Sequence, residues 1–179
     1  MILKKAVRVL MEQQLISKNK EIDLTFQSAI SAYKSQNLDQ SIELAYKTLS
    51  LNPSHYMSFN LLGIISYSKG DFEIAIEYFD KSLKINKNVD VLYNQATVFT
   101  SIKKHKLAII NYNQILDITP NNTKALFNKG LSLHEMKKYK EALKYYEKAI
   151  ETNPYNIEHI KSKALTYLTI ERYEEALFF

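Results

Sequence analysis

The fold of this chain is decided by residues 123–156, which read TKALFNKGLSLHEMKKYKEALKYYEKAIETNPYN. Small and apolar residues recur here at the three- and four-residue spacings of an amphipathic helix. They form two series, which are Leu126, Gly130 and Leu133, then Ala142, Tyr146 and Ala149. The stretch therefore predicts two helices joined by a short turn.

The surfaces on which these two helices face each other carry small residues. Gly130 and Ala142 would let the helix axes approach to about 8–10 Å, the distance of closely packed helices. The ring of Tyr146 is expected to fill the space beside them. A larger side chain at position 130 or 142 should therefore separate the pair.

The same pattern recurs along the chain with a period close to 34 residues. Small residues occupy two columns, which are Ala29, Gly63, Ala96, Gly130 and Ala164, then Ser41, Ala75, Ala108, Ala142 and Ala176. Successive members of both columns are 34, 33, 34 and 34 residues apart. Two columns that share one irregular spacing indicate a tandem repeat with a single one-residue deletion.

The corners between the helices are predicted from prolines, a glycine and capping residues. The chain has three prolines, and they are Pro53, Pro120 and Pro154. They mark one corner of the repeat, because proline suits the link before a new helix, and Lys87 stands where a fourth would be. At the other corner Gly70 can take the left-handed conformation that ends a helix, and Asp71 is expected to cap the next one. Asn37 and Asp39 are expected to act similarly one repeat earlier.

This pattern resembles the tetratricopeptide repeat family, which combines small residues on both helices, aromatic residues beside them and a proline near the end of each repeat. The strings LFNKG at 126–130 and YKEALKYYEKAIETNP at 139–154 are most similar to it. The resemblance covers residues 22–179, as repeats 22–55, 56–88, 89–122, 123–156 and a partial fifth, 157–179. It implies an all-α fold, a right-handed α-solenoid of tandem helix-turn-helix units.

The sequence departs from the family pattern at two kinds of position. Gln95, Lys129 and Lys163 replace the usual leucine directly before the first small column. The first repeat has Ala32 and Ala45 where aromatic residues are common. The first repeat is therefore the poorest match to the family.

Residues 1–21 precede the repeats and carry their own helical pattern. The residues at helical spacing are Leu3, Val7, Leu10 and Gln14. We predict a separate amphipathic N-terminal helix that caps the first repeat, since the end of a repeat array needs its apolar face covered. The alternative is a helix that docks on a partner or on a membrane surface.

Composition excludes several classes of protein. The 179 residues include no cysteine, which rules out disulfides, thiolate metal sites and cysteine nucleophiles. No apolar run approaches the roughly 18 residues of a membrane span, and no signal-peptide core is present, so we expect a soluble, cytoplasmic protein. The net charge of +5 comes almost entirely from lysine, and nucleic acid is a disfavoured partner.

Residues that carry chemistry are scattered. The four histidines, at different repeat positions, are His55, His105, His134 and His159. No pair of them has the spacing of a zinc site, and the chain has neither a glycine-rich phosphate loop nor the serine of a hydrolase. We expect no metal, no cofactor and no catalytic residue, and hence no enzyme.

The family resemblance implies that one stripe of the first helices lines a concave groove. The predicted groove residues are Tyr33, Asn60, Ile64, Tyr67, Tyr93, Asn94, Thr97, Lys124, Phe127, Asn128, Leu131 and His134. An exposed aromatic and amide-rich stripe of this extent is typical of an interaction site. Asn60, Asn94 and Asn128 could hydrogen-bond an extended peptide backbone, or they could instead hydrogen-bond the adjacent repeat. The charged form of the groove that binds chaperone C-termini is matched only at Asn94 and Lys124, so it is not supported.

Three functions follow from this reading. The favoured one is a non-catalytic adaptor that binds an extended, partly apolar segment of a protein or peptide in its groove. The first alternative is the N-terminal, substrate-recruiting module of a larger enzyme. The second is nucleic-acid binding through a lysine-rich corner made of Lys103, Lys104, Lys106, Lys137, Lys138 and Lys140. Because the fifth repeat stops at Phe179, we also expect either a longer native protein or self-association through Phe178 and Phe179.

Overall fold

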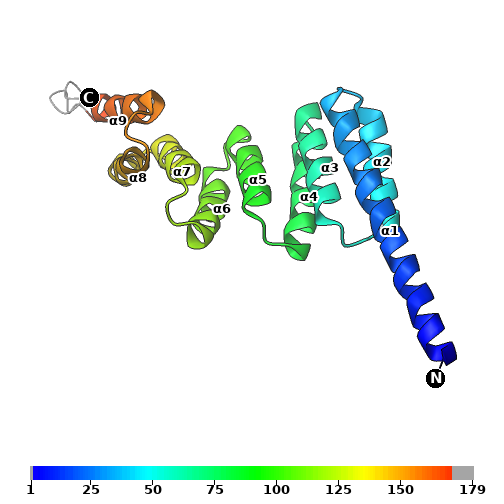
Figure 1. Ribbon diagram of the computed structural model, residues 1–179. Coiled ribbons are helices and arrows are strands. Elements are labelled where there is room, and N and C mark those ends of the chain that lie inside the picture. Colours follow the sequence, from blue (N-terminus) through cyan, green and yellow to red (C-terminus); the bar gives the residue numbers. More distant parts are fainter. Residues whose placement is uncertain (1, 171–179) are drawn as a thin grey trace. The chain divides into compact units, whose positions relative to one another are not determined.

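Short corners join the helices, which the computed structural model describes over residues 2–170 (Figure 1). In chain order the described helices are α1 (Ile2–Lys34), α2 (Leu38–Leu51), α3 (Tyr56–Lys69), α4 (Phe72–Ile85), α5 (Val89–Ser101), α6 (His105–Ile118), α7 (Thr123–Glu135), α8 (Tyr139–Thr152) and α9 (Ile157–Thr169). Those residues form no strand. The chain divides into two compact parts, Met1–Asn86 and Lys87–Phe179, here called the N-terminal half and the C-terminal half.

In each repeat after the first, the first helix begins at the first residue of the predicted repeat. Helices α3, α5, α7 and α9 begin at Tyr56, Val89, Thr123 and Ile157. Asparagine caps explain three of these starts, because the side-chain oxygens of Asn88, Asn122 and Asn156 accept hydrogen bonds from the N–H groups of the first turn. The bond from Ala125 N to Asn122 Oδ1 is 2.9 Å long. These caps were not predicted, although an asparagine directly precedes the last three predicted repeats.

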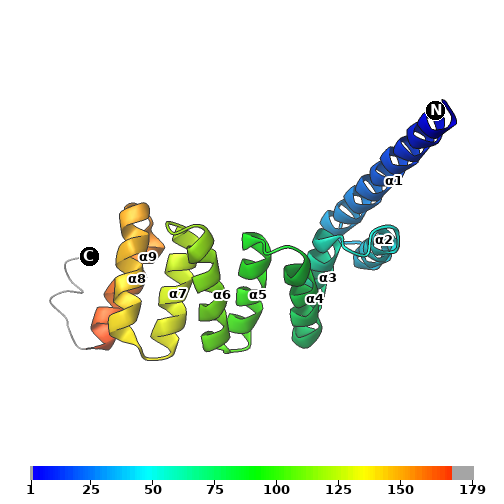
Figure 2. The same cartoon turned by 90° about the horizontal axis from the view of Figure 1, so that it is seen from below.

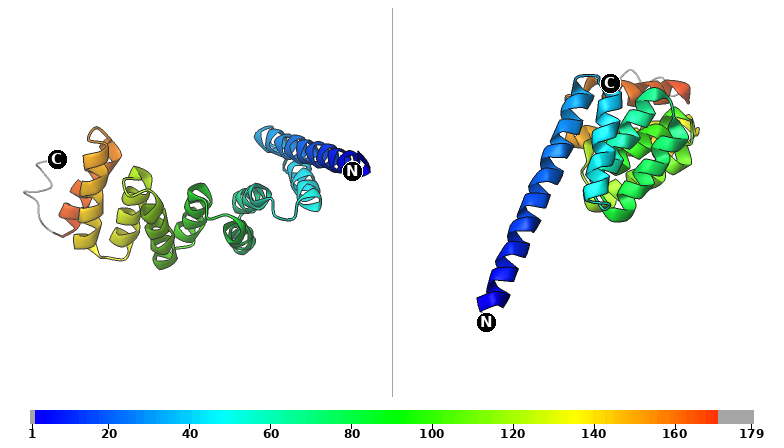
Figure 3. Two further views of the ribbon diagram at one scale, coloured as in Figure 1. Left: turned by 60° about the horizontal axis from the view of Figure 1, so that its bottom comes forward. Right: turned by 90° about the vertical axis from the view of Figure 1, so that its right-hand side faces the viewer.

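In the N-terminal half, α2 packs against α1 and α4 packs against α3 (Figure 3). Its core is made of Ala29, Ala45, Leu61, Leu62 and Ile65, all nearly or completely buried. The Ser41 hydroxyl of the second small column donates a 2.9 Å hydrogen bond to the carbonyl of Ala29 in the first. The two columns therefore meet where α1 and α2 cross, as the sequence pattern predicts.

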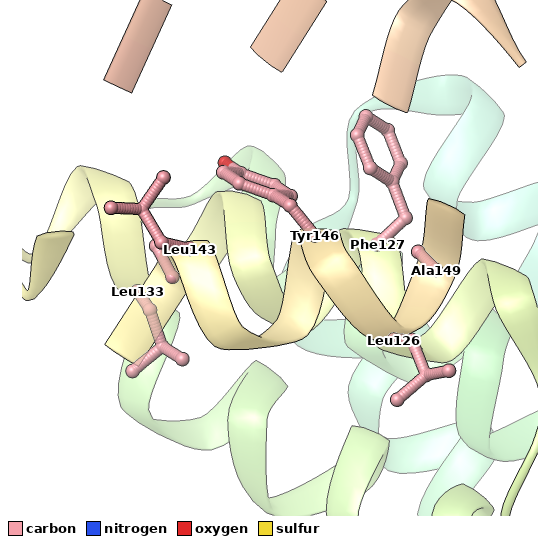
Figure 4. Packing of buried hydrophobic residues seen from close by; sticks show 7 residues of the cluster. Leu126, Phe127, Leu133, Leu143, Tyr146 and Ala149 are labelled. Carbon is pink, nitrogen blue, oxygen red and sulfur yellow. The ribbon is translucent and has the colours of Figure 1, made fainter. Parts of the chain in front are cut away.

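In the C-terminal half, α5, α6, α7 and α8 form a row of neighbouring helices, and α9 packs on α8 (Figure 2). The core between α7 and α8 appears in Figure 4, and its buried members are Leu126, Phe127, Leu133, Ala142, Leu143, Tyr146 and Ala149. Both series picked out in residues 123–156 thus supply this core.

The glycines of the first small column lie against aromatic rings of the paired helix. A Cβ atom built on Gly130 would be 2.6 Å from Cε1 of Tyr146, and one built on Gly63 would be 2.7 Å from Cε1 of Phe79. Such distances are shorter than van der Waals contact, so any side chain would displace the ring. The close approach predicted for Gly130 is confirmed.

The corner inside each of the first four repeats uses a left-handed residue, as predicted for Gly70, whose φ is 86°. The residues at the same corner of the first, third and fourth repeats are Gln36, Lys103 and Lys137, with φ of 62°, 58° and 60°. Asn37 caps α2 as predicted. The predicted cap at Asp71 is wrong, because its side chain makes no cap hydrogen bond even though its backbone (φ −83°, ψ 68°) is close to that of the capping Asn37 (φ −86°, ψ 76°).

The N-terminal segment differs from the expected separate capping helix. Residues before position 22 are the first part of α1, a continuous 33-residue helix that extends beyond α2 (Figures 1 and 3). The reason is local, since no proline or glycine interrupts this stretch. Its described side chains are exposed, with Leu10 at 59% and Met11 at 64%, and Ile22 is the first that is buried. This segment therefore does not cover the first repeat.

Over residues 2–170, none of the helices combines the length and apolar character needed to cross a bilayer. The predicted self-association involves Phe178 and Phe179, which lie outside the described residues.

We predict that Gly130→Ala lowers the free energy of unfolding by about 1 to 3 kcal/mol, because the new methyl group overlaps the Tyr146 ring. Chemical denaturation of the wild type, Gly130→Ala, Tyr146→Leu and the double variant would measure this cost. The double variant should lose less stability than the sum of the single changes, since removing the ring relieves the overlap.

Gly70→Ala is the matched control, because its Cβ would meet nothing within 4 Å and only its left-handed backbone would be strained. Its cost should be unchanged by Tyr146→Leu. If Gly130→Ala unfolds with wild-type free energy, the contact is not the constraint that we describe.

Candidate peptide-binding site

The predicted groove residues lie on the first helices of the repeats, four in the N-terminal half and eight in the C-terminal half. Those of the N-terminal half are Tyr33 on α1 and Asn60, Ile64 and Tyr67 on α3. Those of the C-terminal half are Tyr93, Asn94 and Thr97 on α5, and Lys124, Phe127, Asn128, Leu131 and His134 on α7. Most are partly buried, Lys124 is exposed and Phe127 is buried.

In the C-terminal half, Tyr93, Lys124 and Asn128 form one cluster that joins α5 to α7. The Asn128 amide nitrogen donates to the Tyr93 hydroxyl oxygen at 3.1 Å and to the carbonyl of Lys124 at 2.8 Å. The Lys124 ammonium lies 5.1 Å from the centre of the Tyr93 ring. For Asn128 the alternative reading therefore holds, because its amide hydrogens are used within the array.

The Tyr93 hydroxyl keeps its proton at neutral pH. Burial raises the pKa of Tyr93, with a smaller contribution from Glu158, while the hydrogen bond from Asn128 acts in the opposite direction. Since the Tyr93 oxygen accepts from Asn128, its own hydrogen can be donated to another acceptor. A carbonyl of an extended peptide is one such acceptor.

Phe127 is not a groove residue, which corrects the sequence prediction. Its side chain is only 6% exposed, and its ring lies 4.5 Å from the His159 ring on α9. The Phe127 ring is also 5.8 Å from the Tyr146 ring on α8, and both rings are labelled in Figure 4. The next repeat covers the ring, a contact that the pattern within one repeat does not reveal. Phe127 therefore stabilises the junction between repeats.

His134 is also engaged by its neighbours. Its Nδ1 atom is 2.9 Å from the hydroxyl of Thr166 on α9, and its ring packs against the edge of Tyr139 at 5.1 Å. His134 thus links α7 to α9 and is only partly accessible.

In the N-terminal half the predicted stripe is aromatic and half-buried. Tyr33 packs on the core of this half, and the Tyr67 ring lies 5.9 Å from the Phe72 ring. Asn60 and Tyr67 also make interactions inside the protein, as does Asn94 in the other half. What each half presents is a partly accessible surface of hydroxyls, amides and rings.

Models of protein families match three consecutive stretches of the chain. Each is described as a tetratricopeptide repeat, and the matched residues are 26–90, 89–122 and 123–156. The chain belongs to the tetratricopeptide repeat family.

Solved structures with similar folds include other tetratricopeptide repeat proteins. MamA (41-end) from Desulfovibrio magneticus RS-1 is 18% identical, with a TM-score of 0.80 over 87% of this chain and 89% of that one. YrrB, described as a TPR protein with an unusual peptide-binding site, is 24% identical, with a TM-score of 0.76 over 92% and 86%. A tetratricopeptide repeat protein from Parabacteroides merdae ATCC 43184 is 20% identical, with a TM-score of 0.81 over 88% and 63%. At these identities the likeness concerns the fold alone. The chain has no match among curated protein sequences.

The polar residues before the first small column of these tetratricopeptide repeats are buried and paired. Gln95 Oε1 accepts from Asn111 Nδ2 at 2.9 Å, and Lys163 Nζ is 3.2 Å from Glu147 Oε1. Lys129 Nζ donates to the Tyr145 hydroxyl at 2.5 Å. The three substitutions are visible in the sequence, but their partners were not predicted. A signal for them was present, because each partner (Asn111, Tyr145 and Glu147) is a polar or hydroxyl-bearing residue on the second helix of a repeat.

The six lysines of the predicted basic corner are exposed at two turns of the C-terminal half, between α5 and α6 and between α7 and α8. A hollow of about 430 Å³ at the first turn is bounded by Lys103 to Leu107 and by Met136 from the second turn, so the two turns are neighbours. Lys138 pairs with Glu141 at 3.0 Å. The lysines thus form a solvent-facing basic patch apart from the groove residues.

Among the residues that the structure describes, no three histidine or acidic side chains come together in a group able to hold a metal ion. His55 and His159 pack against phenylalanine rings instead, at centroid distances of 4.6 Å from Phe26 and 4.5 Å from Phe127. Burial lowers the pKa of both histidines, despite opposing effects of Asp23 on His55 and of Glu158 on His159. These two histidines are neutral parts of the repeat interfaces at pH 7.

We predict that the free energy of unfolding falls as the pH is lowered from 7.5 to 5.5. A histidine with a lowered folded-state pKa binds its proton mainly in the unfolded state, so stability is present above pH 6.5 and is lost below it. Urea unfolding at several pH values would measure the slope. His159→Phe, which keeps a ring against Phe127, should reduce the slope, and a stability that rises toward pH 5.5 would contradict the assignment.

Proposed function

We propose that this protein is a non-catalytic interaction scaffold that binds an extended, partly apolar peptide segment along the first helices of its repeats. The single observation that carries the proposal is the cluster of Tyr93, Lys124 and Asn128, which fixes a hydroxyl donor on a half-buried aromatic surface. Membership of the tetratricopeptide repeat family supports it, as does the fold shared with YrrB, whose description names a peptide-binding site.

The chemistry of this surface suits an extended peptide backbone. Hydroxyl and amide groups donate to and accept from peptide groups, while rings and aliphatic side chains cover apolar side chains. On α5 the polar groups are Tyr93, Asn94 and Thr97, and on α7 Leu131 supplies apolar surface. Because the Tyr93 hydroxyl is held by Asn128, a ligand would meet a preorganised donor.

The lysine patch supports a second candidate, the binding of nucleic acid. None of its six exposed lysines is a predicted groove residue, so variants can distinguish the two functions. Binding at the patch would be strongly weakened by salt, because lysines that contact phosphates displace counterions.

We predict that the groove variants Tyr93→Phe and Asn94→Ala weaken a peptide selected from a random display library. Each lost hydrogen bond should cost about 0.5 to 1.5 kcal/mol, or roughly 2- to 10-fold in Kd. Fluorescence polarisation with the labelled peptide would measure it, and circular dichroism would establish that each variant retains its helices.

The matched comparison replaces Lys103, Lys104, Lys137 and Lys138 by glutamine, which should leave the Kd within about twofold, less than the loss expected for one hydrogen bond. Selected ligands that survive both groove changes but are lost with the lysine changes would assign binding to the patch.

A further inference from the structure

A hollow of about 680 Å³ lies in the C-terminal half between α6, α7 and α8, and it shares no residue with the groove. We call it the Lys129 pocket. The side chains that matter for its chemistry are Asn113, Asp117, Lys129, Tyr145, Lys148 and Glu151.

Lys129 is a buried cation in this pocket with an incomplete set of partners. Its side chain is only 9% exposed, its Nζ donates to the Tyr145 hydroxyl at 2.5 Å, and it lies 3.9 Å from the centre of the Tyr145 ring. No carboxylate among the described residues forms an ion pair with it. A buried charge is costly unless it is paired, and an ammonium group has three hydrogens to donate.

The next repeat shows the partner that Lys129 lacks. Lys163 occupies the same position 34 residues later, is 8% exposed, and pairs with Glu147 Oε1 at 3.2 Å. The residue 34 positions before Glu147 is Asn113, which lines the Lys129 pocket. A buried lysine therefore occupies the same position in two successive repeats. Lys163 has a carboxylate of the protein as its partner, whereas Lys129 has a neutral amide at the corresponding position and a hollow beside it.

We propose that the Lys129 pocket is a second peptide-binding site that takes the carboxylate of an acidic side chain. One carboxylate oxygen accepts from Lys129 Nζ and the other accepts from the Tyr145 hydroxyl, whose hydrogen is available because its oxygen already accepts from Lys129. Lys148, which also lines the pocket and lies 5.8 Å from the centre of the Tyr145 ring, adds positive charge.

The pocket also limits what surrounds that carboxylate. Asp117 and Glu151 line it and are exposed, so they repel a ligand with several negative charges and favour basic neighbours. The ligand is therefore a peptide in which one acidic residue is flanked by basic ones.

The test uses acetyl-Lys-Glu-Lys-amide and its control acetyl-Lys-Gln-Lys-amide, titrated into the full chain and followed by the backbone amide NMR signals of Asn113, Asn121 and Thr152. The glutamate peptide should give saturable shifts with a Kd at least tenfold lower than the glutamine peptide. Equal binding of the two peptides would overturn the proposal, and so would saturation by inorganic phosphate at lower concentration than by the glutamate peptide.

Asn113→Glu is the decisive variant, because it supplies Lys129 with the carboxylate that Lys163 already has. It should abolish glutamate-peptide binding while raising the melting temperature. Lys129→Met should also abolish binding. Lys144 is an exposed lysine on α8, the helix that carries Tyr145, and it does not line the pocket, so Lys144→Gln should leave binding unchanged. Undiminished binding by folded Asn113→Glu would overturn the proposal. The groove variants leave this pocket intact, so the two sites can fail independently.

Discussion

The structure depends on the contact between a small residue of each first helix and the helix paired with it. Gly130 against the ring of Tyr146 and Gly63 against the ring of Phe79 leave no room for a β-carbon. Tight contacts of this kind fix the distance between paired helices, since packed interiors cannot absorb even one extra methyl group without strain. Burial raises the pKa of Tyr146, which keeps that ring uncharged in the core.

The repeats keep small residues in both columns, but they differ in the residue directly before the first column. There the chain places Gln95, Lys129 and Lys163, each buried and each with a polar partner on a second helix. A buried polar pair adds little stability compared with apolar residues in the same place. If the wrong helices packed together, however, one buried polar group would be left without its partner, which is costly. We infer that these pairs specify which helices pack together, and the Lys129 pocket is the place where such a pair is incomplete.

Much of the fold could be predicted because its determinants are local. The small columns, the starts of α3, α5, α7 and α9 and the left-handed Gly70 all follow from spacing and backbone preference within one repeat. The errors concern contacts made by a neighbouring element. Phe127 fits a groove stripe, yet α9 buries its ring. The start of α1 has an apolar pattern, but its described side chains are exposed. A different kind of error is Asp71, a residue type that often caps helices, whose side chain makes no cap hydrogen bond here.

The site could be predicted only in part for the same reason. Spacing identified a stripe of tyrosines and asparagines, but whether an asparagine faces a ligand or the next repeat depends on geometry between repeats, as Asn128 illustrates. The partner of Lys129 could not be predicted either, because Tyr145 lies on a different helix and the spacing within one helix does not show which side chains of two helices meet.

Peptide binding to the first helices can be measured by hydrogen–deuterium exchange of the full chain, with and without a display-selected apolar peptide that lacks acidic residues. We expect slower exchange on binding at the amides of the first helices α5 and α7, with little change in α6 and α8. Protection confined to α6, α8 and the lysine turns, with α5 and α7 unchanged, would contradict this expectation.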